Sequence, residues 1–514
     1  MPLPLPLRPG LPSGAASSRF AAALLPLFLA MHFLVVPAAA RAQNLPELGD
    51  AARQDLSPLM ERKLGERVMR AIRRSPDYLD DAPVQEYLAG VGNALLAAAP
   101  EARGDAQYDF FFFAVRDPVL NAFALPGGFI GVHTGLILAA QTESELAAVL
   151  SHEIGHVVQH HIARMLGEQK ENSLISLGSL LLGALATTAS PDAGMGIMMG
   201  GQGLAVQRQL HFSRDAEREA DRVGLGILEK SGYEPAGMVT FFDRLQQANR
   251  GYTDVPPFLL THPLTTERMA DIEDRIRDLR YRQHVDSLDF PLIQARVRVL
   301  QDPSVQGLRD AADVFRRQAM QNPPPLLLAA QYGLALVALQ QGEPARAQAY
   351  LDAAQAMLQQ SFGTAADPVL ENLAIAIRIA AHQPQQAVAE ADRARNAFPL
   401  SRGIAQQYAR ALLAAGRNAE AERYLRDQVR LYRREADSYR LLAQACAAQG
   451  KEAQQHMALA EFYALDGSLQ AALDQLGIAR RAGDASFYDQ SIIDAREREW
   501  RAQRLQEMQE EKGS

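Results

Sequence analysis

The sequence predicts a mostly helical α+β protein in which an N-terminal domain with a small β-sheet precedes an all-α domain. Three observations predict this fold class. The chain has 514 residues, too many for one hydrophobic core, which favours at least two domains. Strand patterns are confined to residues 108–133, and beyond about residue 280 only helical patterns rich in alanine, leucine and glutamine remain. With 48% hydrophobic and 22% charged residues, most of the chain should fold as a soluble protein.

Charge and cysteine content exclude several kinds of partner and site. The formal net charge of -8 gives no overall basic field, so we expect no nucleic-acid partner. Cys446 is the single cysteine, so neither an intramolecular disulfide nor a thiolate metal cluster can form. Any metal site must therefore use histidine, aspartate or glutamate.

The first 42 residues are typical of an export signal. Arg8 and Arg19 precede the apolar run 20–37, and small residues at 40 and 42 stand at the spacing of a cleavage site. The mature chain would then begin at Gln43. The alternative is an uncleaved membrane anchor, because the apolar run approaches spanning length. A lipid-modified cysteine is excluded because Cys446 lies far downstream.

Two strand-rich stretches follow. Residues 108–115 contain four consecutive phenylalanines and end at a turn, Asp117-Pro118. In residues 121–132, two apolar runs are broken by Pro126-Gly127-Gly128, which predicts a pair of strands joined by a turn. This pair could be a substrate-binding edge or simply a buried hairpin.

The next segment contains the main chemical motif on a helix. Thr142 to Glu145 matches a capping box and begins an apolar stripe, so a helix should start there. His152 and His156 are four residues apart and share one face, where both imidazoles can bind one ion. Glu153 is displaced by about 100° around the helix, which lets its carboxylate reach a water at the metal without being a ligand. Two structural histidines are the alternative.

A third ligand is predicted downstream of this helix. Glu217 and Asp221 are four residues apart beside small residues, so their helix face can press against the motif helix. We expect Glu217 to bind zinc and Asp221 to accept a hydrogen bond from a zinc-bound imidazole. Without the motif, this stretch would be a salt-bridged helix face. The pair His156 and His160 is discounted because Gln159 would then replace the general base.

Residues 174–203 are apolar and then rich in glycine and methionine, but the apolar run is too short to span a bilayer. The candidates are a lid over the site, a hairpin at a membrane surface, a surface for apolar clients, or plain core.

The C-terminal half resembles tetratricopeptide repeats. Gly416 and Gly450 mark helix turns about 34 residues apart, the period of such repeats, whereas His382 stands where a turn glycine is expected. An irregular helical bundle is the alternative. The predicted divisions are a signal peptide (1–42), a metallopeptidase domain (43–290), a helical linker (291–325), a repeat domain (326–490) and a charged, solvated tail (491–514).

Together, residues 121–128, His152 to His156, and Ser213-Arg214 leading to Glu217 and Asp221 resemble the HtpX-type zinc metallopeptidases. The export signal and the repeats make the chain most similar to their BepA-like periplasmic branch. The resemblance implies a zincin-like domain that holds one Zn²⁺ per chain. It also implies that His262 can occupy the fourth zinc position as a plug, although the residue could merely precede a helix. The location implied is the periplasm, with misassembled outer-membrane β-barrel proteins as clients and the barrel-assembly machinery as partner.

These observations lead to the hypothesis of a zinc-dependent endopeptidase. In it, Glu153 takes a proton from the zinc-bound water and later gives it to the leaving amine. The substrate would add as a strand along the edge formed by Asn121, Phe123, Ala124, Leu125 and Pro126. The alternative function is a repeat-based chaperone or adaptor with a silent or structural zinc site. A membrane-embedded protease is a further rival. Peripheral contact with a membrane fits either function.

Overall fold

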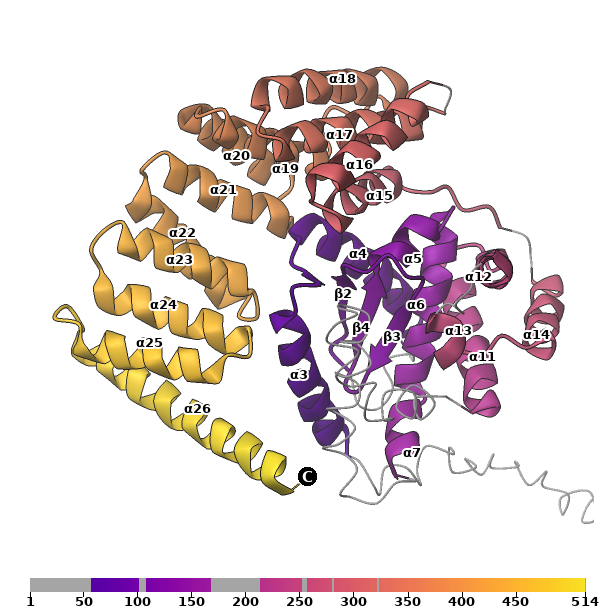
Figure 1. Cartoon of the computed structure of the whole chain (residues 1–514), viewed down its shortest axis with the longest axis horizontal. Helices are drawn as coiled ribbons and strands as arrows, with labels where there is room; N and C mark the ends of the chain where they lie inside the picture. Colours follow the sequence, from indigo (N-terminus) through magenta and orange to yellow (C-terminus); the bar gives the residue numbers. More distant parts are fainter. Residues whose placement is uncertain are drawn as a thin grey trace, which may run out of the picture. The chain divides into compact units, whose positions relative to one another are not determined.

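The structure is a computed structural model, and Figure 1 shows its helices and strands coloured along the sequence. It describes residues 57–100, 108–167, 213–251, 257–279, 282–320 and 323–513. The expected signal peptide, the segment 174–203 and residues 252–256 of the loop before His262 lie outside these ranges. The predicted fold class is confirmed, because one small sheet is accompanied by many helices. In the described ranges, we find no helix with the length and apolar character needed to cross a bilayer.

A four-stranded sheet lies in the N-terminal half. Its strands are β1 (Tyr78–Leu79), β2 (Phe111–Val115), β3 (Ala122–Leu125) and β4 (Phe129–His133). Their order is β1-β2-β4-β3, with β2 and β4 parallel and the other pairs antiparallel. The predicted strand pair is thus β3 and β4, and the turn glycines between them, Gly127 and Gly128, have φ angles of 77° and 90°. β3 is an edge strand, so one row of its backbone groups points away from the sheet.

Helices cover both faces of this sheet. Successive strand side chains point to opposite faces, so the phenylalanine run supplies both. Phe113 and Leu125 pack with Met69 of α3 (Pro58–Arg74). Phe112 and Ile130 belong instead to the main hydrophobic core. That core also contains side chains of α4 (Ala82–Ala98) and α6 (Glu143–Val158).

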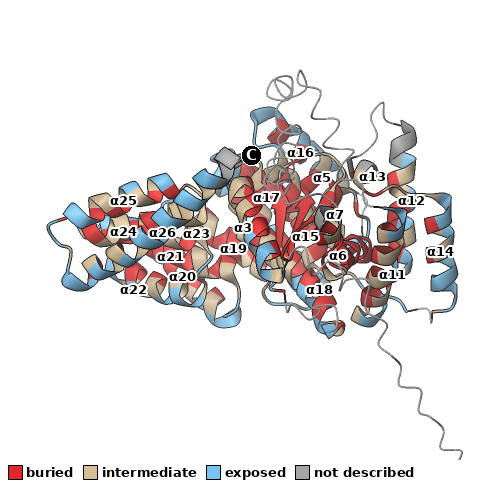
Figure 2. Cartoon of the chain, turned by 90° about the horizontal axis from the view of Figure 1, so that it is seen from below, coloured by how far each residue is buried: buried red, intermediate tan, exposed pale blue. Residues whose placement is uncertain are grey.

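α6 is the helix that the capping pattern predicts. The Thr142 side chain accepts a hydrogen bond from the backbone amide of Glu145, and Glu145 reaches back to the amide of Gln141. Every side chain from Glu143 to Val157 is buried, and Figure 2 shows this helix in the colour of buried residues. The helix is therefore part of the core along its whole length.

The other helices of the N-terminal half surround α6 and the sheet. They are α5 (Thr134–Ala139), α7 (His161–Gly167), α11 (Arg214–Ser231), α12 (Ala236–Gly251), α13 (Pro257–Thr261), α14 (Thr266–Arg277) and α15 (Asp289–Gln301). α11 and α12 both contact α6, and α14 contacts α11 and α12.

The C-terminal half contains only helices among its described residues, and successive helices pack against one another. They are α16 (Val305–Gln318), α17 (Pro324–Gln340), α18 (Pro344–Phe362), α19 (Pro368–Ala380), α20 (Pro384–Ala397), α21 (Arg402–Ala414), α22 (Asn418–Leu431), α23 (Ala436–Ala447), α24 (Glu452–Leu465), α25 (Leu469–Arg481) and α26 (Phe487–Gly513). Gly342, Gly416 and Gly450 lie in turns with φ angles of 69° to 75°. His382 adopts a φ of 57° between α19 and α20, so it takes the glycine conformation without being glycine.

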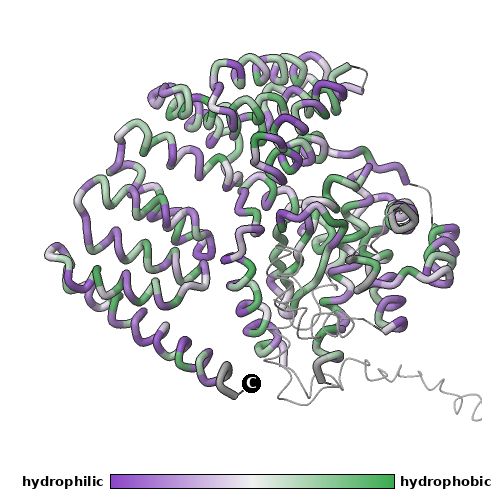
Figure 3. The backbone as a smooth tube through the Cα atoms, in the orientation of Figure 1, coloured by the Kyte–Doolittle hydropathy of each residue, from purple (hydrophilic) through white to green (hydrophobic). Residues whose placement is uncertain are grey.

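The segment predicted as a solvated tail differs from that expectation. α26 begins before it, at Phe487, and its inner face is packed, because Ile493 and Trp500 are buried with side chains of α24 and α25. Glu507 accepts a hydrogen bond from Arg70 of α3 at 2.7 Å. Figure 3 shows that most of α26 is nevertheless hydrophilic. The charge pattern predicted the exposed face and gave no sign of the packed one.

The hydrophobic core does not stop where the predicted metallopeptidase domain ends. One cluster of buried side chains extends from the sheet through Ile293 of α15 and Leu336 of α17 to Leu373 of α19. Arg296 of α15 strengthens this junction, since it donates to both carboxylate oxygens of Asp81 at 2.7 Å and to the Tyr332 hydroxyl at 2.8 Å. The first helices of the C-terminal half are therefore built onto the N-terminal core.

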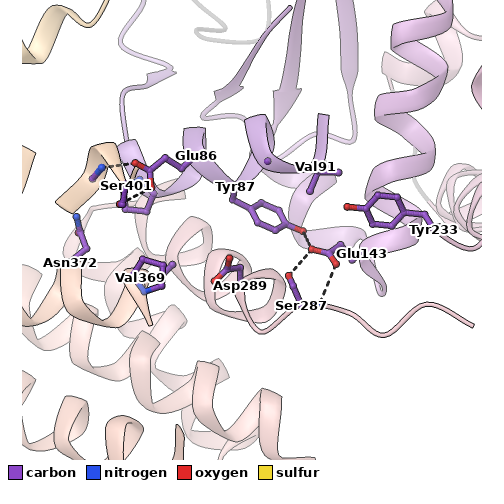
Figure 4. Close-up of a pocket in the computed structure, with 14 residues that line it drawn as sticks. Glu86, Tyr87, Val91, Glu143, Tyr233, Ser287, Asp289, Val369, Asn372 and Ser401 are labelled. Atoms are coloured by element: carbon purple, nitrogen blue, oxygen red, sulfur yellow. Dashed lines mark hydrogen bonds between the residues drawn. The ribbon is translucent and has the colours of Figure 1, made fainter. Parts of the chain in front are cut away.

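A cavity of about 260 Å³ with polar and apolar lining lies at the same junction (Figure 4). Glu143, at the start of α6, accepts hydrogen bonds there from the Tyr87 hydroxyl at 3.0 Å and from the Ser287 hydroxyl at 2.7 Å. Across the cavity, Glu86 of α4 accepts from the Ser401 hydroxyl at 3.0 Å, just before α21. These bonds connect α4 and α6 to Ser287, just before α15, and to the start of α21 in the C-terminal half.

Candidate metal centre

α6 brings the two motif histidines together. The Nε2 atoms of His152 and His156 are 3.1 Å apart, and both side chains are fully buried. Their spacing of four residues places them one above the other on the helix, as the sequence predicts. Both rings thus direct their Nε2 atoms to one point.

α11 supplies the carboxylate. One Glu217 oxygen lies 3.6 Å from His152 Nε2, and the other lies 3.5 Å from His156 Nε2. The two helices approach closely because glycines lie at their contact. A Cβ added to Gly224 would be 3.0 Å from the His152 backbone, and one added to Gly155 would be 2.9 Å from the Ala220 carbonyl oxygen. The small face predicted around Glu217 is therefore what allows the carboxylate to reach the imidazoles.

His262 completes a group of four donors. It follows α13, and its Nδ1 lies 3.0 Å from a Glu217 oxygen and 3.4 Å from His152 Nε2. Its ring stacks on Phe258, with centroids 4.6 Å apart. Helix α14 begins only at Thr266, so His262 lies in the connection between two helices and does not directly precede one.

The donor atoms fit a zinc ion. Zinc in proteins is tetrahedral with bonds of about 2.0–2.1 Å to nitrogen and oxygen, which places neighbouring ligand atoms roughly 3.3–3.4 Å apart. The close pairs among these residues, counting both Glu217 oxygens, are 3.0 to 3.6 Å apart, and one ligand atom of each residue lies within 4.8 Å of the other three. Three imidazoles and one carboxylate are also ligands that zinc accepts. These four residues could hold the ion.

Asp221 and Arg268 lie behind the group. Asp221 Oδ1 is 3.0 Å from His152 Nδ1. Arg268, which is buried, donates to both Asp221 oxygens at 2.6 and 2.7 Å and lies 2.8 Å from a Glu217 oxygen. Burial alone would raise the pKa of Glu217, but the imidazoles of His262 and His152 outweigh it and hold that pKa well below its usual range. Glu217 is thus a carboxylate, the form that binds metal.

A second set of side chains lies behind His156. Its Nδ1 is 2.9 Å from the Nδ1 of His161, whose Nε2 is 3.2 Å from a Glu219 oxygen. Arg164 donates to the same oxygen at 2.8 Å. Burial lowers the pKa of His161 to about 4, so this imidazole is neutral near pH 7.

Glu153 lies beside the four donor residues, and its side chain ends in a buried carboxylate. The side chain is fully buried, and neither oxygen has a hydrogen-bond partner of normal geometry among the described residues. His262 Nε2 is 3.6 Å away. Burial raises the pKa of Glu153, while His262, His152 and the backbone amide of Ala124 act in the opposite direction. A buried carboxylate with a raised pKa is suited to accept and return a proton.

The five residues expected to bind substrate lie along β3 and its two ends. Asn121 precedes the strand, and Pro126 begins the turn to β4. Ala124 is on the α6 side, where its amide lowers the pKa of Glu153. Phe123 is on the opposite side and half-buried, whereas Leu125 is buried. The edge strand therefore runs past the motif helix.

The alternative pair of His156 and His160 is not brought together. His160 lies just past the end of α6 with a φ of 51°. Its Nδ1 is 3.0 Å from Glu61 and 3.1 Å from the Tyr108 hydroxyl. Geometry is thus a second reason, beside the position of Gln159, to discount His156 and His160 as the ligand pair.

A second acidic group, Glu143 with His284 and Asp286, also gathers three side chains that could bind a metal. The Glu143 oxygens there accept from Tyr87, His284 and Ser287. Because donors occupy the oxygens that a cation would need, this group is a hydrogen-bonded joint.

Sequence reasoning gave no role to Arg268 or His161. Arg268 had a detectable signal, because it stands four residues before Ile272 on the buried stripe of its helix, and a charge on such a stripe requires a buried partner. His161 had none, because its position depends on the break in the chain at His160.

Comparison with known proteins is consistent with this geometry. Residues 85–276 match Peptidase family M48. The "Beta-barrel assembly-enhancing protease" of Shigella flexneri is 32% identical over 465 residues, which is 90% of this chain and 92% of that protein. The "Putative beta-barrel assembly-enhancing protease" of Vibrio cholerae is 36% identical over 302 residues, 58% of this chain and 61% of that one. The "Mitochondrial metalloendopeptidase OMA1" of Schizosaccharomyces pombe is 27% identical over 216 residues, 41% of this chain and 60% of its own.

Proposed function

The chain belongs to peptidase family M48, and from this membership we propose that it is a zinc-dependent endopeptidase of the periplasm that cleaves misassembled outer-membrane β-barrel proteins. The observation that supports the proposal most is the set of four donor residues, with one ligand atom of each within 4.8 Å of the others, next to the buried Glu153. The names of the relatives support the choice of client.

His152, His156 and Glu217 would hold the zinc, with His262 in the fourth position of the resting enzyme. Bound zinc would supply a Lewis acid that polarises the scissile carbonyl and makes water more acidic. Glu153 would take the proton of the attacking water and return it to the leaving amine. Asp221 would keep His152 in the orientation and tautomer that direct Nε2 to the ion.

An extended substrate would pair with the outer edge of β3. Backbone pairing holds a peptide in register without demanding a particular side-chain sequence. This suits clients that are recognised because they are unfolded. The same strand runs past Glu153, so the paired peptide would lie near the proton acceptor.

The helical C-terminal half would hold the client and dock on the barrel-assembly machinery. A cavity of about 980 Å³ lies between the start of the sheet and helices α21 to α24. Its lining combines aromatic side chains, among them Phe110, Phe111, Tyr432 and Phe462, with many charged ones, such as Arg402, Arg434 and Asp437. The words "assembly-enhancing" in the relatives' names favour a second role, in which this half assists assembly without cleavage.

Glu153→Gln separates these roles. The variant should bind one zinc per chain, measured by metal analysis, because Glu153 is not a ligand. It should lose at least about 100-fold in cleavage of an unfolded β-barrel protein, since a glutamine cannot accept the proton. Undiminished cleavage would overturn the hydrolytic mechanism. Full rescue of a deletion strain by the variant would favour the assembly role.

A further inference from the structure

The orientation of the His156 ring is determined by its two nitrogens. Its Nε2 faces the other donors, 3.1 Å from His152 Nε2 and 3.5 Å from a Glu217 oxygen. A neutral imidazole has one nitrogen with a lone pair and one with a hydrogen. If Nε2 is to bind a metal, Nδ1 must therefore be the N–H donor and needs an acceptor.

His161 is placed to be that acceptor. The two Nδ1 atoms are 2.9 Å apart, and the rings meet edge to face with centroids 4.8 Å apart. Once His161 Nδ1 accepts, its Nε2 must have the hydrogen, and Glu219 lies 3.2 Å from that atom. Arg164 then holds the Glu219 carboxylate at 2.8 Å. This assignment gives each of the four ring nitrogens a role, and no two of these roles conflict.

The break after α6 is what makes this contact available. In a continuous helix, a residue five positions after His156 would point about 140° away from it. α6 instead ends at Val158 with Gln159 as its C-cap, His160 takes a left-handed φ of 51°, and His161 begins α7. The reversal turns the buried His161 ring back toward His156. A histidine that only filled space in the core would not need this reversal of the chain.

The same arrangement occurs behind the other motif histidine. His152 Nδ1 lies 3.0 Å from Asp221, and Arg268 holds the Asp221 carboxylate. Both rings are thus supported by a carboxylate of α11 that is itself held by an arginine. The difference is that an imidazole stands between His156 and its carboxylate, Glu219.

We propose that His161 is a positioning residue that fixes the tautomer and orientation of His156 for zinc binding. The proposal rests on the proposed function, because it assumes that His156 binds the ion. Loss of such a supporting residue typically weakens metal affinity by about 10–100-fold.

The test measures zinc affinity of the full chain by competition with a chromophoric chelator. His161→Leu removes the acceptor, and we expect about 10–100-fold weaker binding. His161→Asn places an amide oxygen near the position of Nδ1, and we expect it to recover most of the affinity. The Co²⁺-substituted absorption bands should shift in His161→Leu and remain close to wild type in His161→Asn. His160→Asn is the matched control, because asparagine tolerates the left-handed conformation, and its affinity should equal that of wild type.

Three results would overturn the proposal. The first is wild-type zinc affinity in His161→Leu. The second is an equal loss in His161→Asn and in His160→Asn. The third result comes from Glu219→Gln, which replaces His161→Leu if that variant does not fold. Glu219 suits this test because it is at the surface end of the contacts that run from His156 through His161. Weaker zinc binding with unchanged melting of the apoprotein supports the proposal, and unchanged binding overturns it. A wild-type chain that binds no zinc would remove the proposed function as well, so the two failures are distinguishable.

Discussion

His262 contributes the fourth donor atom of the metal group, and a working zinc peptidase needs that position for water. The residue lies in the connection between α13 and α14, not on the helices that position the other donors. Connections of this kind move more readily than packed helices. A resting enzyme closed by His262 would therefore open by moving this connection.

His262→Ala should keep the zinc, because three ligands remain, and should cleave an unfolded protein faster than wild type. We expect a gain of several-fold in kcat/KM, measured with a quenched peptide beside metal analysis. Glu217→Ala is the comparison, since it removes a ligand that we place in the active form, and it should lose both zinc and activity. Lower activity in His262→Ala with zinc retained would contradict a closing role.

Arg268 is the residue whose loss should be most damaging outside the donors. Removing one partner of a buried ion pair costs about 3–5 kcal/mol, because the remaining charges are left unpaired. We expect Arg268→Gln to lower the free energy of unfolding by this amount and to loosen Glu217 and Asp221. Arg218→Gln is the control, because its pair with Glu267 is exposed and worth at most about 1 kcal/mol. Urea unfolding of both variants decides, and equal losses would argue against the buried clamp.

At the scale of the elements, the contact between α6 and α11 decides whether Glu217 can reach the imidazoles. Gly224 leaves 3.0 Å between an added Cβ and the His152 backbone, whereas an added Cβ on Gly226 meets no atom within 4 Å. Gly224→Ala should push the helices apart, cost about 1–3 kcal/mol and weaken zinc binding. Gly226→Ala should instead stabilise the helix by about 0.5–1 kcal/mol. Thermal melting and chelator competition measure both effects, and equal behaviour of the two variants would contradict the close approach.

Sequence patterns predicted α6, the strand pair and the segment containing Glu217, because each has a local cause. Thr142 caps, glycines form the turn, and four-residue spacing aligns side chains on one helix face. The role of His161 could not be predicted, since it follows from a single left-handed residue. The packed face of α26 was also missed, because the side chains that cover it belong to other helices, α24 and α25, and leave no mark in the charge pattern of α26 itself.

At the scale of the whole molecule, a pair of carboxylates lies where the N-terminal core meets the helices of the C-terminal half. Asp289 starts α15, and Asp367 caps α19 by accepting from the amides of Val369 and Leu370. Burial, followed by the nearby charge of Asp367, raises the pKa of Asp289 to about 6. Compared with the unfolded chain, the folded state therefore favours the protonated form of Asp289.

The sign of the pH effect follows from this shift. A carboxyl whose folded-state pKa is raised stabilises the protein below its unfolded pKa of about 3.9, and this contribution is lost as the pH rises through about 6. Asp289→Asn should remove the dependence, so its melting temperature should exceed that of wild type at pH 8 and approach it at pH 5. Melting curves across this range test the expectation, and parallel curves for both proteins would contradict it.

The buried cluster that runs from the sheet into α17 and α19 has a consequence for how such chains can evolve. A repeat array that shared no interior with its neighbour could be exchanged as a cassette between unrelated catalytic modules. In this protein, exchange would leave Ile293 and the other inward side chains of α15 facing solvent. The helices beyond α19 bury their side chains in other clusters and meet the N-terminal half through polar contacts such as Ser401 to Glu86 and Arg70 to Glu507, so altering them would disturb the shared core less.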